Sequence, residues 1–167
     1  FKSWAWAFGG LMMCCLPSSN WAGEVQVAVA SHFAAPMKGI AHSFERDTGH
    51  RLRVSLGSTG QLDAQIRNGA PFQVFLAADA ETPLKLERDG FTLAGSRFTY
   101  ATGRLALWSR QPDMVDPQGE VLRRITTQRI AIAQPQLAPY GAAAIEIMEH
   151  MGLLSILQSR LVFGSNV

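Results

Sequence analysis

The first half of the chain opens with a buried-strand pattern that passes directly into an amphipathic-helix pattern. Val25–Ala30 is apolar apart from Gln26, as in a strand that is covered on both faces. From Phe33 onward, apolar residues recur at helical spacing until Gly49, a residue type that commonly ends helices. The inward face of this helix is predicted to hold Phe33, Met37, Ile40, Ala41 and Phe44.

The same alternation of strand and helix continues to about residue 90. The next elements are predicted as strands over 51–56 and 71–78 and helices over 61–69 and 79–88. The loops between them are short, which favours a parallel sheet whose crossover connections are right-handed. The pattern therefore predicts an α/β fold.

The second half begins with a different pattern, a long extended run over residues 97–109 that Thr102–Gly103 interrupts. A strand that crosses between two lobes would have this pattern. Beyond a polar loop, the pattern predicts a helix near 119–125, a strand over 129–133, a helix over 142–152 and a strand end within 160–167. We therefore expect a first α/β lobe over 24–102 and a second over 103–167.

Residues 1–23 follow the order of a secretory signal peptide. A lysine precedes the apolar run Trp4–Leu16, and small residues follow it. The first residue is Phe rather than Met, so we expect the chain to begin inside the signal; a buried N-terminal helix is the alternative. Both cysteines, Cys14 and Cys15, lie in this segment, so the exported chain would have no thiol chemistry. A lipid anchor at one of them is a further alternative.

Composition and charge exclude several classes of function. Apolar residues make up 47% of the chain, which is enough for a hydrophobic core, and charged residues only 17%. The net charge of +2 is not concentrated in any Lys/Arg cluster, so nucleic acid is not expected as a partner. The four histidines lack metal-ligand spacing, so no direct metal site is expected.

Small polar residues follow several predicted strands at the point where a helix begins. Ser31 follows the first strand, Ser58-Thr59-Gly60 the second, and Pro139-Tyr140-Gly141 the strand over 129–133. In parallel sheets ligands bind beyond the carboxyl ends of strands, and helix N-termini attract anions. These residues are also ordinary helix caps. The pattern alone leaves capping and anion binding open.

Four segments resemble one known family. They are "VAVASHFAAPMKGIAHSFERDTGH", "SLGSTGQLDAQIRNGAPFQVFLAADAETPLKLERDG", "YATGRLALWS" and "RIAIAQPQLAPYGAAAIEIMEHMGL". In order and spacing they are similar to the periplasmic molybdate-binding proteins of ABC transporters. The resemblance implies an α/β, two-lobed type II periplasmic-binding-protein fold that closes on molybdate or tungstate. It also implies a monomeric periplasmic receptor that has no cofactor or enzymatic activity and delivers the anion to an ABC permease.

The resemblance also implies the ligand-binding residues. The family's first hydroxyl matches Ser31, and its second matches Thr59, with Ser58 beside it. Backbone N–H groups of the family match those of Tyr140 and Val167. The family continues beyond this point with further elements and a tyrosine ligand, so the resemblance implies that the sequence is a piece of a longer protein whose second lobe is incomplete.

Three alternatives remain open from the sequence. A receptor for sulfate or a small organic acid would keep the fold, and Arg104 is the candidate partner for an organic carboxylate. A transcription regulator uses the same fold as an effector domain, but it would need a helix-turn-helix and no export signal. An enzyme would use Ser31 and His32 as nucleophile and base, although adjacent residues seldom point the same way and no G-x-S-x-G motif is present.

Overall fold

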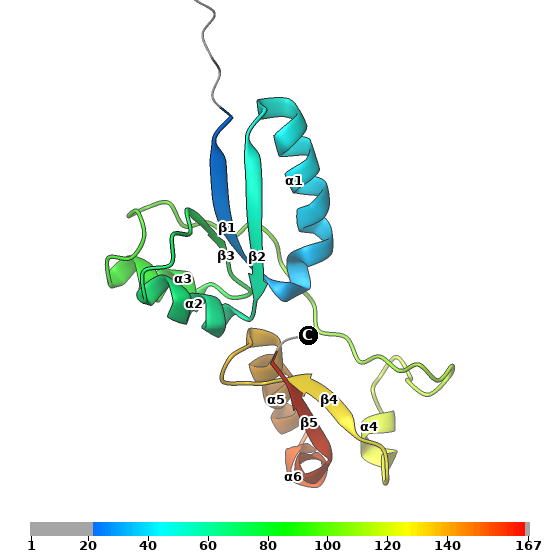
Figure 1. The fold of residues 1–167 in the computed structure, drawn as a ribbon. Helices are drawn as coiled ribbons and strands as arrows, with labels where there is room; N and C mark the ends of the chain where they lie inside the picture. Colours follow the sequence, from blue (N-terminus) through cyan, green and yellow to red (C-terminus); the bar gives the residue numbers. More distant parts are fainter. Residues whose placement is uncertain (1–21, 166–167) are drawn as a thin grey trace, which may run out of the picture.

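A computed structural model describes residues 22–165. Figure 1 shows two groups of elements joined by an extended segment. The predicted signal segment and its cysteines lie almost entirely outside the described residues, as does Val167. Among the helices of residues 22–165, none is long and apolar enough to span a membrane.

The first group is built on a parallel sheet of three strands. Strands β1 (Glu24–Ala30), β2 (Arg51–Gly57) and β3 (Val74–Leu76) are arranged in the order β2-β1-β3. Val27 on the central strand pairs with Val54 on one side and Val74 on the other. All three carboxyl ends therefore lie at the same edge of the sheet, as the alternating pattern predicts.

Helices cover both faces of this sheet. Helix α1 (Ala34–Thr48) lies on one face, while α2 (Thr59–Arg67) and α3 (Glu81–Arg88) lie on the other (Figure 1). A short 3₁₀ turn, η1 (Ser31–Phe33), joins β1 to α1. Gly49 ends α1 in a left-handed conformation with φ of 72°, as its position in the pattern suggests. Val27, Val29 and Met37 form the core between α1 and the sheet.

Two expectations for this group are wrong in detail. Ile40 is 49% exposed rather than turned inward, because no described element packs over that side of α1. The third strand is only three residues long instead of spanning 71–78. It ends early because the Ala78 N–H donates to Thr59 Oγ1 rather than to a neighbouring strand.

The extended segment connects the two groups, as predicted, but it is not a strand. Residues 96–109 form neither helix nor strand, because no described strand lies beside them to complete a ladder. The segment is instead held against the first group by Tyr100. The Tyr100 hydroxyl donates to the Ala77 carbonyl at 2.8 Å, and its ring meets the Phe33 ring edge-on, with the centroids 5.0 Å apart.

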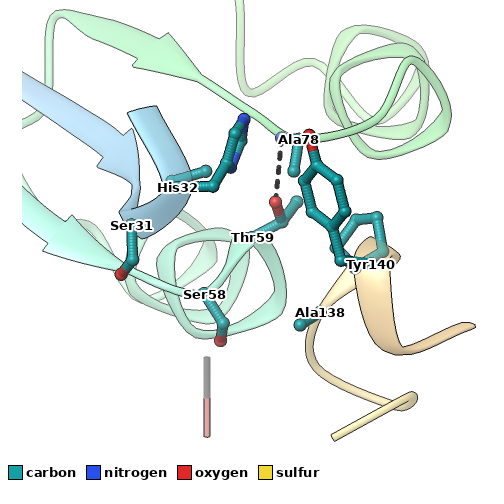
Figure 2. A pocket seen from close by; sticks show the side chains of 9 residues that line it. Ser31, His32, Ser58, Thr59, Ala78, Ala138 and Tyr140 are labelled. Carbon is teal, nitrogen blue, oxygen red and sulfur yellow. Dashed lines mark hydrogen bonds between the residues drawn. The ribbon is translucent and has the colours of Figure 1, made fainter. Parts of the chain in front are cut away.

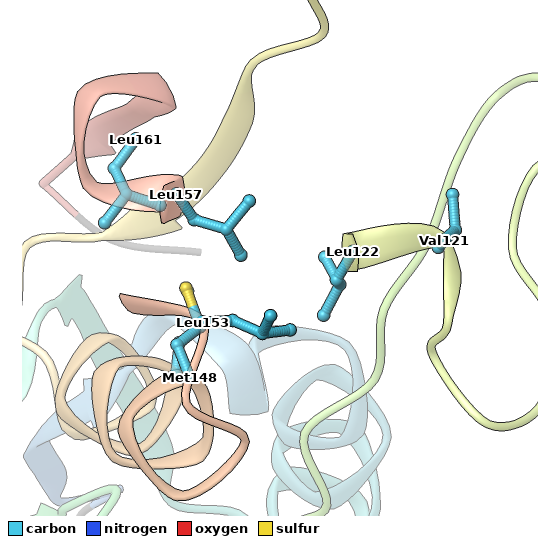
Figure 3. Close-up of a cluster of buried hydrophobic side chains, with 7 residues drawn as sticks. Val121, Leu122, Met148, Leu153, Leu157 and Leu161 are labelled. Carbon is cyan, nitrogen blue, oxygen red and sulfur yellow. The ribbon is translucent and has the colours of Figure 1, made fainter. Parts of the chain in front are cut away.

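The second group contains a parallel pair of strands and three helices. Its elements are α4 (Val121–Arg124), β4 (Ile130–Ala133), α5 (Pro139–His150), α6 (Leu154–Leu157) and β5 (Leu161–Gly164). β4 and β5 pair in parallel. A core of Val121, Leu122, Ala144, Met148, Leu153, Leu157 and Leu161 holds the group together (Figure 3). The short helix α6 is absent from the sequence-based prediction.

Candidate functional site

A pocket lies where the strand ends of the first sheet meet the start of α5 (Figure 2). Its lining residues are Ala30, Ser31, His32, Ser58, Thr59, Ala78, Ala138, Pro139 and Tyr140. The structure therefore brings together the predicted residues Ser31, Ser58, Thr59 and Tyr140. None of these lining residues is a lysine, arginine, aspartate or glutamate.

Ser58 lies at the N-terminus of α2 and caps it. Its hydroxyl accepts from the Gln61 N–H at 3.3 Å, while the Gln61 side chain accepts from the Ser58 N–H at 3.0 Å. This reciprocal pair is a capping box, and it explains why α2 begins at Thr59 rather than at the predicted residue 61. A hydroxyl that accepts one bond still has its own hydrogen to donate.

Thr59 is 2% exposed, and its hydroxyl is directed at the first lobe's own backbone. Thr59 Oγ1 accepts from the Ala78 N–H at 3.0 Å. In Figure 2 this oxygen points toward Ala78, whereas the hydroxyls of Ser31 and Ser58 point the other way. The Thr59 oxygen thus accepts from the amide at the end of β3, and the ligand-binding role that the resemblance implies for its hydroxyl stays a prediction.

The first turn of α2 lies at the pocket and has one backbone N–H group without an acceptor among the described residues. The Ser58 and Gln61 amides are used in the capping box, and the Gly60 amide donates to the Leu137 carbonyl at 2.9 Å. Among the hydrogen bonds of the described residues, none uses the Thr59 amide. A helix N-terminus carries a partial positive charge, so this N–H is suited to an anion.

The first turn of α5 has the same arrangement. Pro139 is its first residue and has no N–H, and the Gly141 and Ala142 amides donate to the Ala138 carbonyl. Among the described hydrogen bonds, Tyr140 N–H is the amide of this turn that has no acceptor. The helix begins at Pro139 rather than at the predicted residue 142, and this brings Tyr140 to the pocket.

His32 was considered from the sequence only as a catalytic base, and the structure gives it another position. Its ring lies against the Tyr140 ring, with the centroids 4.9 Å apart and the planes inclined by 56°. Burial lowers the pKa of His32 below its ordinary value of 6.5, which favours the neutral ring at neutral pH. In Figure 2 the side chains of Ser31 and His32 point away from each other, which does not fit a nucleophile–base pair.

Two other sequence candidates are not brought to the pocket. Arg104 is exposed on the connecting segment and does not line the pocket, so the organic-acid alternative loses its proposed charge partner. Val167 lies outside the described residues. Within residues 22–165, no group of three His, Cys, Asp or Glu side chains is placed to hold a metal ion.

The sequence reasoning missed two groups that shape this pocket. Ala78 fixes the Thr59 hydroxyl, and the Leu137 carbonyl joins α2 of the first group to the loop before α5. A signal for Ala78 existed, since it ends the strand predicted over 71–78 and directly precedes a predicted helix. Leu137 acts through its backbone, which residue type does not reveal.

Comparison with known families identifies the group to which this chain belongs. The model of the bacterial extracellular solute-binding proteins matches residues 25–167. The chain belongs to this family. A pocket between two α/β groups, lined by helix N-termini, is consistent with a solute-binding protein.

Two curated relatives of this solute-binding protein share a name. It is 52% identical over 161 residues to the "Molybdate-binding protein ModA" of Azotobacter vinelandii, which covers 96% of this chain and 63% of the relative. It is 45% identical over 166 residues to the protein of the same name from Rhodobacter capsulatus, covering 99% of this chain and 65% of the relative. The chain thus spans somewhat less than two thirds of the length of these relatives.

A solved structure confirms the fold class. The Azotobacter vinelandii periplasmic molybdate-binding protein matches this solute-binding protein with a TM-score of 0.82 and 46% identity, over 85% of this chain and 62% of that chain. The α/β, two-lobed periplasmic-binding-protein fold predicted from the sequence is therefore confirmed. We refer to the first and second groups of elements as the first and second lobes.

Proposed function

We propose that the protein is a periplasmic receptor that binds molybdate and delivers it to an ABC importer. The observation that carries this proposal is the pocket, to which α2 and α5 bring their N-termini, with no hydrogen bond among the described residues using Thr59 N–H or Tyr140 N–H. Relatives named for molybdate binding, at 52% and 45% identity, support the choice of anion.

The chemistry of the pocket suits an oxyanion that carries no proton. Hydrogen bonds from neutral donors to a charged acceptor each contribute about 1.5–3 kcal/mol, so several of them offset the loss of water from a dianion. Molybdate carries no proton, so each of its oxygens can accept hydrogen bonds from a pocket that offers only donors. A protonated phosphate would direct its own O–H at one of these donors and lose a bond. Tungstate has the same shape and charge and belongs to the same proposal.

The proposed donors come from both lobes. Ser31, Ser58 and Thr59 contribute from the first lobe, the last through its amide, while Tyr140 contributes its amide from the second. Val167, which matches a further backbone donor of the family, is the fifth residue of the proposed set. In this proposal molybdenum is bound only through its oxyanion, with no direct protein–metal bond and no further cofactor.

The wider assignment belongs to the same proposal. Residues 1–23 would act as the export signal, with a lipid anchor at Cys14 or Cys15 as the alternative. The lobes would divide at residues 24–102 and 103–167, and the receptor would be a monomer without enzymatic activity. The pocket's lack of charged side chains and the opposed directions of Ser31 and His32 support a binding role over a hydrolytic one.

Calorimetric titration of the purified protein tests the proposal. Molybdate should bind tightly, while sulfate should bind more weakly and hydrogen phosphate scarcely at all. Ser58→Ala should weaken molybdate binding by about tenfold to a hundredfold, the loss of one charged hydrogen bond. Ser96→Ala, on the exposed connecting segment, is the control and should not change it. Failure of the unaltered protein to bind molybdate would overturn the proposal.

A further inference from the structure

Gly103 lies where the connecting segment passes the start of α5. A β-carbon built at this residue would overlap the Tyr140 hydroxyl and would lie 3.1 Å from Tyr140 Cζ. Gly103 does not have a positive φ, so its backbone conformation is open to other residues. A side chain at this position would therefore require Tyr140 to move, so the constraint is one of space and not of backbone conformation.

Tyr140 connects three parts of the molecule through one side chain. It is the second residue of α5, its ring lies 4.9 Å from the His32 ring of the first lobe, and its hydroxyl lies against Gly103. Tyr140 is the second residue of α5, so a displacement of its ring that rotation about the side-chain bonds does not absorb would shift the first turn of the helix and the Tyr140 amide with it.

The connecting segment cannot easily move away from this contact. Tyr100, three residues before Gly103, is bonded through its hydroxyl to Ala77 O and packs on Phe33. Burial is the larger cause of a raised pKa of Tyr100, and the nearby Tyr140 is the smaller one. Both causes agree with a closely packed group of aromatic rings at the junction. Extra volume at Gly103 would therefore displace Tyr140 rather than the segment.

We propose that Gly103 is a positioning residue, which makes room for the Tyr140 hydroxyl and thereby sets how closely the N-terminus of α5 approaches the first lobe. The consequence for ligand binding rests on the function proposed above, whereas the consequence for lobe contact does not. Gly103 touches no ligand in this proposal, and it acts only through Tyr140.

Three variants test this in the purified protein. Gly103→Ala should weaken molybdate binding by about tenfold to a hundredfold, since the Tyr140 donor moves out of reach. Gly103→Ala combined with Tyr140→Phe removes the atom that the new methyl group overlaps, so it should bind more tightly than Gly103→Ala alone. Gly39→Ala is the matched control, because nothing lies within 4 Å of a β-carbon there, and its affinity should be unchanged.

A second measurement does not depend on the ligand. The Gly60 amide, which donates to Leu137 across the lobes, should exchange its hydrogen faster in Gly103→Ala and recover in the double variant. Unchanged exchange in Gly103→Ala, or a double variant no better than the single one, would overturn the proposal. If the unaltered protein binds no molybdate, the proposed function fails, and the exchange rates still decide the role of Gly103.

Discussion

At the scale of single residues, the buried hydroxyl of Thr59 is a structural acceptor. Thr59→Val keeps the shape of the side chain but leaves the Ala78 N–H without its partner, which should lower the free energy of unfolding by about 1–3 kcal/mol. Urea denaturation measures the change. Thr59→Ser retains the oxygen and should recover most of the loss. Equal stability of the Val and Ser variants would show that the hydrogen bond contributes nothing.

His32 gives a pH dependence at the same scale. Burial holds the pKa of His32 below 6.5 in the folded protein, whereas the unfolded chain keeps the ordinary value. The unfolded state then binds more protons, so stability should fall as the pH drops below about 6.5 and should be fully present above it. His32→Gln should lose less stability between pH 7.5 and 5.5 than the unaltered protein, as urea midpoints at both pH values would show. Parallel losses would contradict this.

At the scale of elements, the backbone of α5 lies so close to the end of β4 that its residue 141 has no room for a side chain. A β-carbon at Gly141 would overlap the Ala133 carbonyl oxygen and lie 3.0 Å from the Pro135 nitrogen, both of which are backbone atoms. Gly141→Ala should therefore destabilise the second lobe by about 1–3 kcal/mol, seen in thermal unfolding. Gly39→Ala, in the open helix α1, should instead stabilise by about 0.5–1 kcal/mol. Similar effects of the two variants would refute the close-approach argument.

The elements also show how far sequence patterns reach. The β1–α1–β2–α2 order follows from apolar periodicity and Gly49, because local spacing determines which faces are buried. The connecting segment was mistaken for a strand, since periodicity reports extended backbone but not whether a partner strand is present. Ser31 and Ser58 lie together at the pocket because strand ends of a parallel sheet converge, whereas Tyr140 comes from the second sheet; their roles in binding stay predictions. The Thr59 hydroxyl faces Ala78 because the Ala78 amide has no partner in a strand ladder, and the sequence alone does not show which amides lack such a partner.

At the scale of the whole molecule, the two lobes contribute one proposed helix-terminal donor each. Molybdate held by the Thr59 and Tyr140 amides would join the lobes, so its addition should make the protein more compact. Small-angle scattering with and without molybdate measures this, and hydrogen phosphate at the same concentration is the control. An unchanged radius of gyration in a protein that binds molybdate would exclude closure of the lobes.

The two sheets are each assembled from a continuous stretch of chain. The three strands of the first lie within residues 24–76, and the paired strands of the second lie within 130–164, with no described strand exchanged between them. During synthesis the described strands of the first sheet can thus pair before those of the second have been translated. Refolding from denaturant should accordingly proceed in stages. Each sheet's own core would form early, and the pocket, which needs residues from both, would be the last part of the protein to appear.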